Sequence, residues 1–272
     1  MLVNGESQDT IAIMDRGFQY GDGLFETIEI QSSKPLFLEQ HLARLVLGCQ
    51  KLLIPKPDLA LLRNEIAQLS SNAGNAVLKI IITRGEGGRG YRQPDSIQST
   101  RILSLHPFPH YPENYYLEGI SARFCETRLG LNPQLAGVKH LNRLEQVLAR
   151  AEWGSDEFQE GLMLNMEHHV IEGTMTNLFY AKNGILYTAP ITHCGIAGII
   201  RAWIMTQYLV VEDYFSMDTL LQSDEIFVCN SIIGIWGIRE LANRHYNIGN
   251  MTQTLQHALL CEKQKQVAYE NV

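Results

Sequence analysis

The stretch HPFPHYPENYYLEG, residues 106–119, divides the sequence into two parts that each carry their own secondary-structure patterns. It holds three prolines and shows neither helical nor strand periodicity. Proline fixes φ and removes a backbone donor, so a stretch of this kind connects domains rather than forming part of one. We therefore expect an α+β fold with two domains, a small N-terminal α/β domain of residues 1–111 and a larger C-terminal domain of residues 112–272.

The N-terminal part mixes strand and helix patterns. Residues 25–30 alternate in polarity and predict a strand, and Leu36–Leu38 predicts a short second strand after the SSKP turn. The segments EQHLARLVLGCQKLL and PDLALLRNEIAQLSSNAG place apolar residues at helical spacing and predict two amphipathic helices. The apolar run at 76–83 and residues 101–106 predict two further strands.

The C-terminal part is richer in strands. A strand near 120–125 precedes a helix expected from Lys139 to Trp153. Residues 161–188 predict a meander of short strands, with turns at Glu167-His168 and Asn183-Gly184. AGIIRAWIMTQYLV predicts a helix, DEIFVCN predicts a buried strand, and the tail from about Thr252 predicts a closing helix.

Composition excludes several classes of function. The net charge is 22 − 29 = −7 without a basic block, so nucleic acid is not an expected partner. The five cysteines are scattered and never in C-x-x-C spacing, which disfavours a disulfide framework or a zinc site and fits a reducing cytosol. The sequence has no basic leader with an apolar core and no apolar run of about 18 residues. We expect a soluble, cytoplasmic protein without a metal or a membrane contact.

The segment TRGEGGRGY, residues 83–91, has the G-x-G-x-x-G spacing of a dinucleotide-binding loop behind a predicted strand. That motif requires a helix to begin at the third glycine, but the following YRQPDSIQST contains a proline and several turn formers. We therefore exclude a nucleotide site. Two interpretations remain, a mobile hairpin loop and a loop that binds carboxylates through arginine.

Lys139 and Glu172 form a pair of groups suited to one cofactor. Lys139 follows a turn at the predicted start of a helix and stands near apolar Val138 and Leu141, whereas Lys79 lies in a predicted strand. An amine in such a setting is either an ordinary solvated lysine or one suited to Schiff-base chemistry. Pyridoxal 5'-phosphate (PLP) needs a lysine for an imine and a carboxylate that keeps its pyridine nitrogen protonated. Glu172, in VIEGTMTNLF, is the candidate carboxylate.

The phosphate of this cofactor needs backbone amides and a cation. The segment GIAGIIRAW begins a predicted helix and offers the amides of Gly198, Ile199 and Ile200. Arg44 is a candidate counter-ion, and Ser231 in CNSIIG could add a hydroxyl. Taken singly, Arg44 is better explained as a surface helix residue and Ser231 as a turn residue.

Nearly the whole chain resembles the fold-type IV PLP enzymes, which include branched-chain aminotransferases, D-amino acid aminotransferases and aminodeoxychorismate lyases. The motifs DRGFQYGDGLFETI, HLARL, TRGEGGRGY, KHLNRLEQV, EGTMTNLF and GIIR occur in the order seen in that family. The resemblance implies a homodimer whose fold is like that of D-amino acid aminotransferase. It also implies roles for six residues: the Schiff-base lysine (Lys139), the partner of the pyridine nitrogen (Glu172), the phosphate arginine (Arg44), the phosphate-binding amides (Ile199, Ile200) and a phosphate hydroxyl (Ser231).

Within the family, RGEGGRGY and NPQLAGVKHLNRLEQVLAR are most similar to the lyase branch. This implies conversion of 4-amino-4-deoxychorismate to 4-aminobenzoate and pyruvate, a step in folate synthesis. Lys139 would act as general base, Arg89 would contact a substrate carboxylate, and Tyr91 would donate a neighbouring hydrogen bond.

An aminotransferase of the same fold is the alternative to the lyase. Leu144 and Phe25 stand where the branched-chain and D-amino acid enzymes, respectively, usually carry a tyrosine, which favours the lyase. A non-catalytic scaffold is disfavoured because Lys139, Glu172 and Arg44 are all retained.

Overall fold

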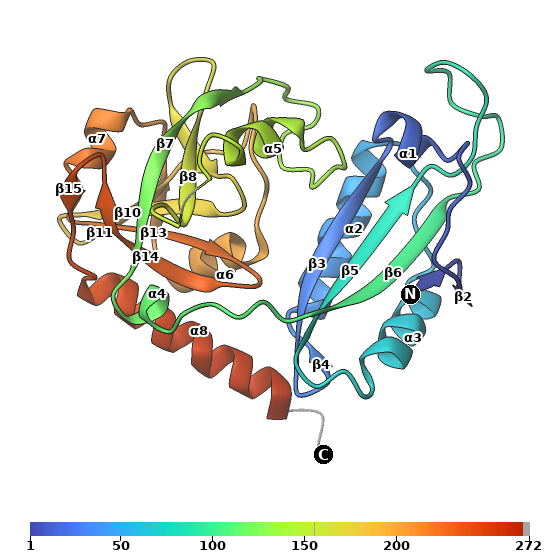
Figure 1. Cartoon of the computed structure of the whole chain (residues 1–272), viewed down its shortest axis with the longest axis horizontal. Helices are drawn as coiled ribbons and strands as arrows, with labels where there is room; N and C mark the ends of the chain where they lie inside the picture. Colours follow the sequence, from blue (N-terminus) through green and yellow to red (C-terminus); the bar gives the residue numbers. More distant parts are fainter. Residues whose placement is uncertain (155, 269–272) are drawn as a thin grey trace. The chain divides into compact units, whose positions relative to one another are not determined.

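The computed structural model describes residues 1–154 and 156–268, and their contacts divide the chain into two units (Figure 1). Unit 1 comprises Met1–Pro109, Val138–Asn142 and the described residues from Lys263 onward, and unit 2 comprises His110–Gly137 and Arg143–Glu262. The main division therefore lies inside the proline-bearing stretch. The segment Val138–Asn142 was expected in the C-terminal domain but belongs to unit 1, because it pairs with a strand of that unit.

Unit 1 is built on a six-stranded sheet in the order β2-β1-β6-β5-β3-β4. Its strands are β1 (Leu2–Val3), β2 (Glu6–Ser7), β3 (Gly23–Gln31), β4 (Lys34–Pro35), β5 (Ala76–Thr83) and β6 (Thr100–Pro107). The predicted strands at 25–30, 76–83 and 101–106 are thus confirmed. β5 lies antiparallel between β3 and β6, so these three strands form the centre of the sheet.

Helices α2 (Leu38–Lys51) and α3 (Leu59–Ser70) pack on one face of this sheet and confirm the two predicted amphipathic helices. Leu42 and Leu45 of α2 meet Ile28 of β3 in a core from which water is excluded. Burial of each such side chain stabilises the fold by about 1.5–3 kcal/mol. The strand expected at Leu36–Leu38 is wrong. Leu36 and Phe37 are buried in a turn that leads into α2, and a short buried apolar run fits either structure.

The opposite face of the sheet carries a different set of side chains. Successive residues of a strand point to opposite faces, so Phe25 and Thr27 face away from the core that contains Leu24 and Ile28. Lys79 of β5 is paired with Thr27 and therefore lies on the same face. Phe25, Thr27 and Lys79 are all half-buried.

Unit 2 contains a nine-stranded sheet in the order β12-β11-β10-β13-β14-β7-β8-β9, with β15 paired to β14. An additional pairing of β9 with β10 closes six of these strands into a barrel-like ring. The strands are β7 (Ile120–Leu129), β8 (Glu160–Asn165), β9 (Val170–Gly173), β10 (Asn177–Lys182), β11 (Ile185–Thr188), β12 (Val210–Glu212), β13 (Glu225–Asn230), β14 (Gly234–Leu241) and β15 (Arg244–His245). The predicted meander and the buried strand DEIFVCN are confirmed.

The remaining helices are short except for the last. They are α1 (Arg16–Tyr20) in unit 1; α4 (Asn114–Leu117), α5 (Leu144–Arg150), α6 (Ile199–Gln207) and α7 (Met217–Leu221) in unit 2; and α8 (Asn250–Ala268), whose residues belong to both units. None of the helices in the described part of the chain combines the length and hydropathy that a bilayer crossing requires.

Candidate functional site

Lys139 lies on an extended segment that pairs with β3. The N–H of Phe25 donates to the carbonyl of Lys139 at 2.9 Å, and the N–H of Leu141 donates to the carbonyl of Gly23 at 3.0 Å. The helix expected to start at Lys139 begins five residues later, at Leu144, because this pairing holds residues 139–141 in extended conformation. The strand edge, and not a helix N-terminus, therefore positions the lysine.

The ammonium groups of two lysines lie against the ring of Phe25. Nζ of Lys139 is 4.4 Å from the ring centroid, and Nζ of Lys79 is 5.4 Å from it. Among the described residues, no carboxylate forms an ion pair with Lys79. From the sequence, Lys79 is expected only as a residue of a strand. The available signal was a single cation inside a run of aliphatic strand residues, on the face opposite the core.

Arg44 of α2 is held by the buried carboxylate of Glu26, which lies next to Phe25 in β3. Its Nε and Nη2 donate to the two oxygens of Glu26 at 2.8 and 2.5 Å, which fixes the plane of the guanidinium. Nδ1 of His41 lies 2.6 Å from Glu26 Oε2. Burial alone would raise the pKa of Glu26, but the charges of Arg44 and His41 and their hydrogen bonds outweigh it and lower the pKa to about 2.

His41 completes this buried cluster beside Glu26. Burial is the main cause that lowers the pKa of His41, and it outweighs the opposing effect of Glu26. A neutral imidazole beside an ionised carboxylate must carry its proton on Nδ1 to donate to it. Arg44 and His41 both contact Glu26 of β3, and Lys139 pairs with Phe25, the residue before Glu26, so the three residues lie in one region of unit 1.

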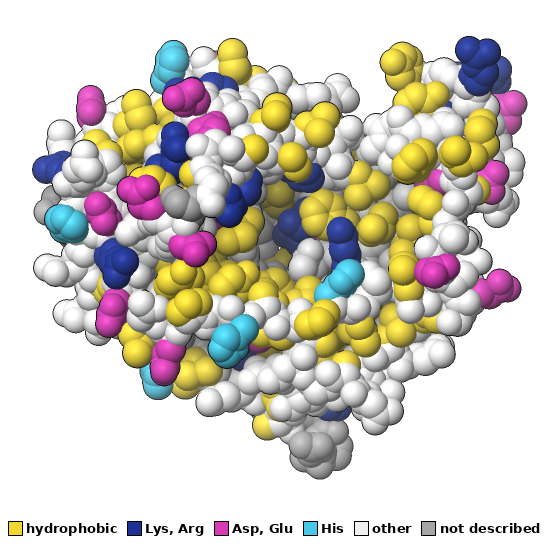
Figure 2. Space-filling view, viewed as in Figure 1, with side chains coloured by type: hydrophobic (Ala, Val, Ile, Leu, Met, Phe, Trp, Pro, Cys, Tyr) yellow, Lys and Arg dark blue, Asp and Glu magenta, His cyan; other side chains and the backbone are white. Residues whose placement is uncertain are grey.

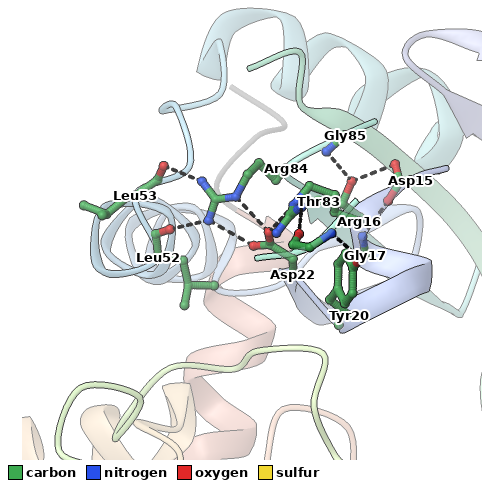
Figure 3. A network of polar contacts seen from close by, with 12 residues as sticks. Asp15, Arg16, Gly17, Tyr20, Asp22, Leu52, Leu53, Thr83, Arg84 and Gly85 are labelled. Atoms are coloured by element: carbon green, nitrogen blue, oxygen red, sulfur yellow. Dashed lines mark hydrogen bonds and ion pairs between the residues drawn. The ribbon is translucent and has the colours of Figure 1, made fainter. Parts of the chain in front are cut away.

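The glycine loop TRGEGGRGY is anchored at its base (Figure 3). Arg84 is buried and donates to Asp22 at 2.8 and 2.9 Å and to the carbonyls of Leu52 and Leu53 at 2.7 Å each. Arg16 donates from Nε to the same Asp22 at 2.9 Å and from Nη1 to the carbonyl of Gly90 at 3.0 Å. Burial would raise the pKa of Asp22, but hydrogen bonds and charge from the two arginines lower it.

The far end of the loop is exposed. Arg89 and Tyr91 both point into solvent in unit 1, and Figure 2 shows basic and hydrophobic side chains gathered at the end of this loop. The ring of Tyr91 contacts that of Tyr20 edge-on at 5.7 Å between centroids. Arg92 pairs with exposed Asp95. The loop therefore has a base fixed around Arg84 and an exposed tip that carries Arg89 and Tyr91, and Arg16 and Tyr20 hold the tip at the backbone of Gly90.

In unit 2, Glu172 is a buried carboxylate at the end of β9. Its Oε2 accepts the N–H of Ile196 at 2.9 Å and lies 3.5 Å from Nδ2 of Asn177. Gly195 has a φ of +86°, and a Cβ there would lie 3.3 Å from the same oxygen, so a glycine suits this close approach. Both of these neighbours of Oε2 are donors, which suits an ionised carboxylate.

The predicted phosphate-binding residues lie at the start of α6. Gly198 is the N-cap residue in extended conformation, and Ile199 and Ile200 are the first two residues of the helix. A glycine supplies no capping side chain, and no side chain caps this helix in the described part of the chain. Ser231 is half-buried in the turn between β13 and β14, where Oδ1 of Asn230 accepts the N–H groups of Ile232 and Ile233.

The predicted site residues are thus distributed over both units. Unit 1 brings Lys139 and Arg44 to neighbouring positions beside β3 and places Arg89 and Tyr91 on the loop tip. Unit 2 connects Glu172 to the segment that precedes α6 through Asn177, a residue that the sequence analysis did not single out.

Comparisons with known proteins agree with these features. The family model of amino-transferase class IV matches residues 23–241. An aminodeoxychorismate lyase of Vibrio harveyi is 37% identical over 93% of this chain and 97% of that protein. A D-alanine aminotransferase of Bacillus licheniformis is 25% identical over 98% of this chain and 99% of that protein. The crystal structure of 4-amino-4-deoxychorismate lyase from Pseudomonas aeruginosa superimposes with a TM-score of 0.91 at 43% identity, over 95% of this chain and 97% of that chain. These similarities confirm the fold class and the resemblance expected from the sequence motifs.

Proposed function

We propose, from the premise that this chain belongs to the aminotransferase class IV family, that it is a lyase that converts 4-amino-4-deoxychorismate to 4-aminobenzoate and pyruvate. The observation that carries the proposal is its similarity, over more than nine-tenths of its length, to two proteins named as lyases for this substrate. The reaction would serve folate synthesis.

The residues present fit PLP as the cofactor. Lys139 offers an amine held at a strand edge, Glu172 offers a buried carboxylate surrounded by donors, and α6 begins with uncapped amides. Arg44 adds a guanidinium whose plane is fixed by Glu26. We propose that Lys139 holds the cofactor covalently, that Glu172 pairs with its pyridine nitrogen, and that Arg44 binds its phosphate with the amides of Ile199 and Ile200 and the hydroxyl of Ser231. When bound, PLP withdraws electrons from the substrate carbon that carries the amine.

Lys139 has a second role as general base. Its amine takes the proton from ring carbon C4 of the substrate, next to the amino group. The bond between C3 and the enolpyruvyl oxygen then breaks, and the ring becomes aromatic. The enolpyruvate leaves with the electron pair of that bond and gains a proton to become pyruvate. The ring of Phe25 supports Lys139 in this role by restricting where its ammonium can lie.

The substrate carries two carboxylates, which the cationic side chains of Arg89 and Lys79 suit. We propose that Arg89 contacts one carboxylate and that Tyr91 donates a neighbouring hydrogen bond. Lys79 is a further carboxylate partner because its ammonium shares the Phe25 ring with Lys139. Arg84 is excluded from this role, since Asp22 and two backbone carbonyls already occupy its guanidinium.

An assay of the purified protein tests the proposal. We expect 4-aminobenzoate and pyruvate to appear in equal amounts when aminodeoxychorismate is added. The family also includes aminotransferases, and the similarity to a D-alanine aminotransferase makes transamination the alternative outcome. Rapid amination of a keto acid by D-alanine or a branched-chain amino acid, without 4-aminobenzoate, would contradict the lyase proposal.

The proposal includes a cytoplasmic homodimer. Each unit exposes apolar side chains, among them Ile13 and Phe18 in unit 1 and Leu144 and Leu148 in unit 2. Exposed apolar surface of this kind supports contact with a second copy of the chain.

A further inference from the structure

Asn177, the first residue of β10, lies directly beside Glu172. The two residues are register partners in the pairing of β10 with β9, so their side chains stand next to each other on one face. Both are buried, with 7% and 3% of their surface exposed. The side chain of Asn177 therefore lies against the carboxylate proposed to bind the pyridine nitrogen.

The amide nitrogen of Asn177 connects Glu172 to the segment before α6. Nδ2 donates to the carbonyl of Ile196 at 2.9 Å and lies 3.5 Å from Glu172 Oε2. The N–H of Ile196 donates to the same oxygen of Glu172 at 2.9 Å. Ile196 is thus held through both its N–H and its carbonyl, and three residues form a closed polar ring.

The amide oxygen of Asn177 contacts the start of α6. A Cβ added at Gly198 would lie 1.9 Å from Oδ1 of Asn177, so this oxygen packs against the backbone of Gly198. Gly198 immediately precedes the amides of Ile199 and Ile200. One side chain therefore contacts the carboxylate at one end and the helix start at the other.

We propose that Asn177 is a positioning residue that fixes the start of α6 relative to the carboxylate of Glu172, and so matches the two anchors to the two ends of PLP. This inference rests on the proposed function, because it takes Glu172 and the α6 amides as the cofactor anchors. A rigid aromatic ligand binds tightly only where its anchors are held in place before it arrives. An aspartate could not substitute, because it would lose the donor to Ile196 and place a second carboxylate beside Glu172.

Binding measurements on apoprotein separate the two ends of the cofactor. Wild type, Asn177→Ala and Glu172→Gln are titrated with PLP, with pyridoxal, and with inorganic phosphate as a competitor. We expect Asn177→Ala to weaken PLP binding about tenfold or more, and to weaken both pyridoxal and phosphate. Glu172→Gln should weaken the binding of pyridoxal and leave the binding of phosphate unchanged. If Asn177→Ala leaves either pyridoxal or phosphate binding unchanged, the positioning role is wrong.

A double-mutant cycle tests the contact with Gly198. Gly198→Ala should weaken phosphate binding in the wild-type background, since the new methyl would collide with Asn177. In the Asn177→Ala background this penalty should shrink, because the space is then available. If Gly198→Ala lowers the phosphate affinity equally in both backgrounds, the proposal is wrong.

Two controls complete the experiment. Asn165→Ala removes another buried asparagine, at the end of β8, whose Oδ1 accepts the N–H groups of Glu167 and His169, and should leave all three affinities unchanged. If Asn177→Ala does not fold, Asn177→Asp of the same size carries the test with the same expected losses. Wild-type protein that binds no PLP would refute the proposed function itself, whereas wild-type binding with unaffected variants would refute only the role of Asn177.

Discussion

At the scale of single residues, Lys139 is distinguished by its surroundings rather than by its place in the sequence. Its amine lies 4.4 Å from the ring centroid of Phe25 and belongs to a segment fixed by β3. In Lys139→Ala, we expect borohydride to attach no PLP to the protein, as judged by mass spectrometry, whereas it does so in wild type. Formation of 4-aminobenzoate should fall by about 10²–10⁴-fold because the general base is lost. PLP attached to the variant after reduction would show that another lysine holds the cofactor.

Lys79 provides a second prediction at this scale. Lys79→Met keeps the length of the side chain and removes its charge, so we expect a KM for aminodeoxychorismate raised about tenfold, with kcat nearly unchanged. PLP binding should be unaffected, which separates this role from that of Lys139. The matched control is Lys56→Met, which removes an exposed lysine of the same unit and should leave KM unchanged. A KM equal to that of wild type would exclude Lys79 from substrate binding.

Glu26 makes stability depend on pH. Its pKa is lowered from 4.5 to about 2 in the folded chain, so the ionised form stabilises the fold above pH 4.5 and this contribution is lost as the pH falls toward 2. The difference corresponds to about 3 kcal/mol. We expect Glu26→Gln to lower the unfolding free energy by about 3–5 kcal/mol at pH 7, because Arg44 loses its counter-charge and only one acceptor oxygen remains for Arg44 and His41.

The pH dependence distinguishes this effect from a packing defect. In thermal or urea denaturation, the difference in unfolding free energy between wild type and Glu26→Gln should become smaller as the pH is lowered from 4.5 toward 2. A difference that stays constant would contradict the assignment of the lowered pKa to Glu26. Glu39→Gln is the control, because that carboxylate pairs with Arg63 on the surface and should change stability little at any pH.

The sequence identified the candidate residues that carry distinctive chemistry and missed those whose role depends on register. Lys139, Glu172 and Arg44 occur in recognisable motifs, and their assignment to PLP stays a prediction. Lys79 and Asn177 are ordinary strand residues in the sequence. Their importance arises only when strand pairing places Lys79 beside Phe25 and Asn177 beside Glu172.

At the scale of elements, the glycine loop combines a fixed base with an exposed tip. Asp22 binds both Arg16 and Arg84, and Arg16 also holds the carbonyl of Gly90, so Asp22→Asn should loosen the base and release the backbone of the exposed tip more often. We expect trypsin to cleave after Arg89 or Arg92 about tenfold faster in this variant, since cleavage follows the population of open forms. Asp95→Asn, which breaks only the exposed pair with Arg92, is the control. Equal cleavage rates in wild type and Asp22→Asn would show that the base does not restrain the tip.

Local patterns predicted most helices and strands, but the prediction is wrong at two places where tertiary contacts determine the backbone conformation. KHLNRLEQV has helical spacing from Lys139, yet pairing with β3 keeps its first residues extended and the helix starts at Leu144. Likewise, Leu36 and Phe37 have strand character but bury their side chains in a turn. Local propensity could not anticipate either case, because the competing partner lies more than 100 residues away for Lys139 and in the surrounding core for Leu36.

At the scale of the whole molecule, the short helix α5 presents an exposed apolar face. Helix α5 exposes Leu144, Val147 and Leu148 by 74%, 59% and 61%, although it has only seven residues. Leaving such a face in water is unfavourable, and a second copy of this chain is the partner that the family resemblance implies. We expect light scattering to give a mass of about twice the 30.8 kDa of one chain.

A charge placed on this face should separate the two copies. In Leu148→Glu, each copy would bury an unpaired carboxylate at the interface, which costs more than the contact supplies. The measured mass should therefore fall toward that of one chain as the protein is diluted. Leu209→Glu is the matched control, because Leu209 is 88% exposed in the same unit but lies after α6, away from α5 in the sequence. A Leu148→Glu protein that stays dimeric would place the interface on another surface, and a monomeric wild type would refute the dimer altogether.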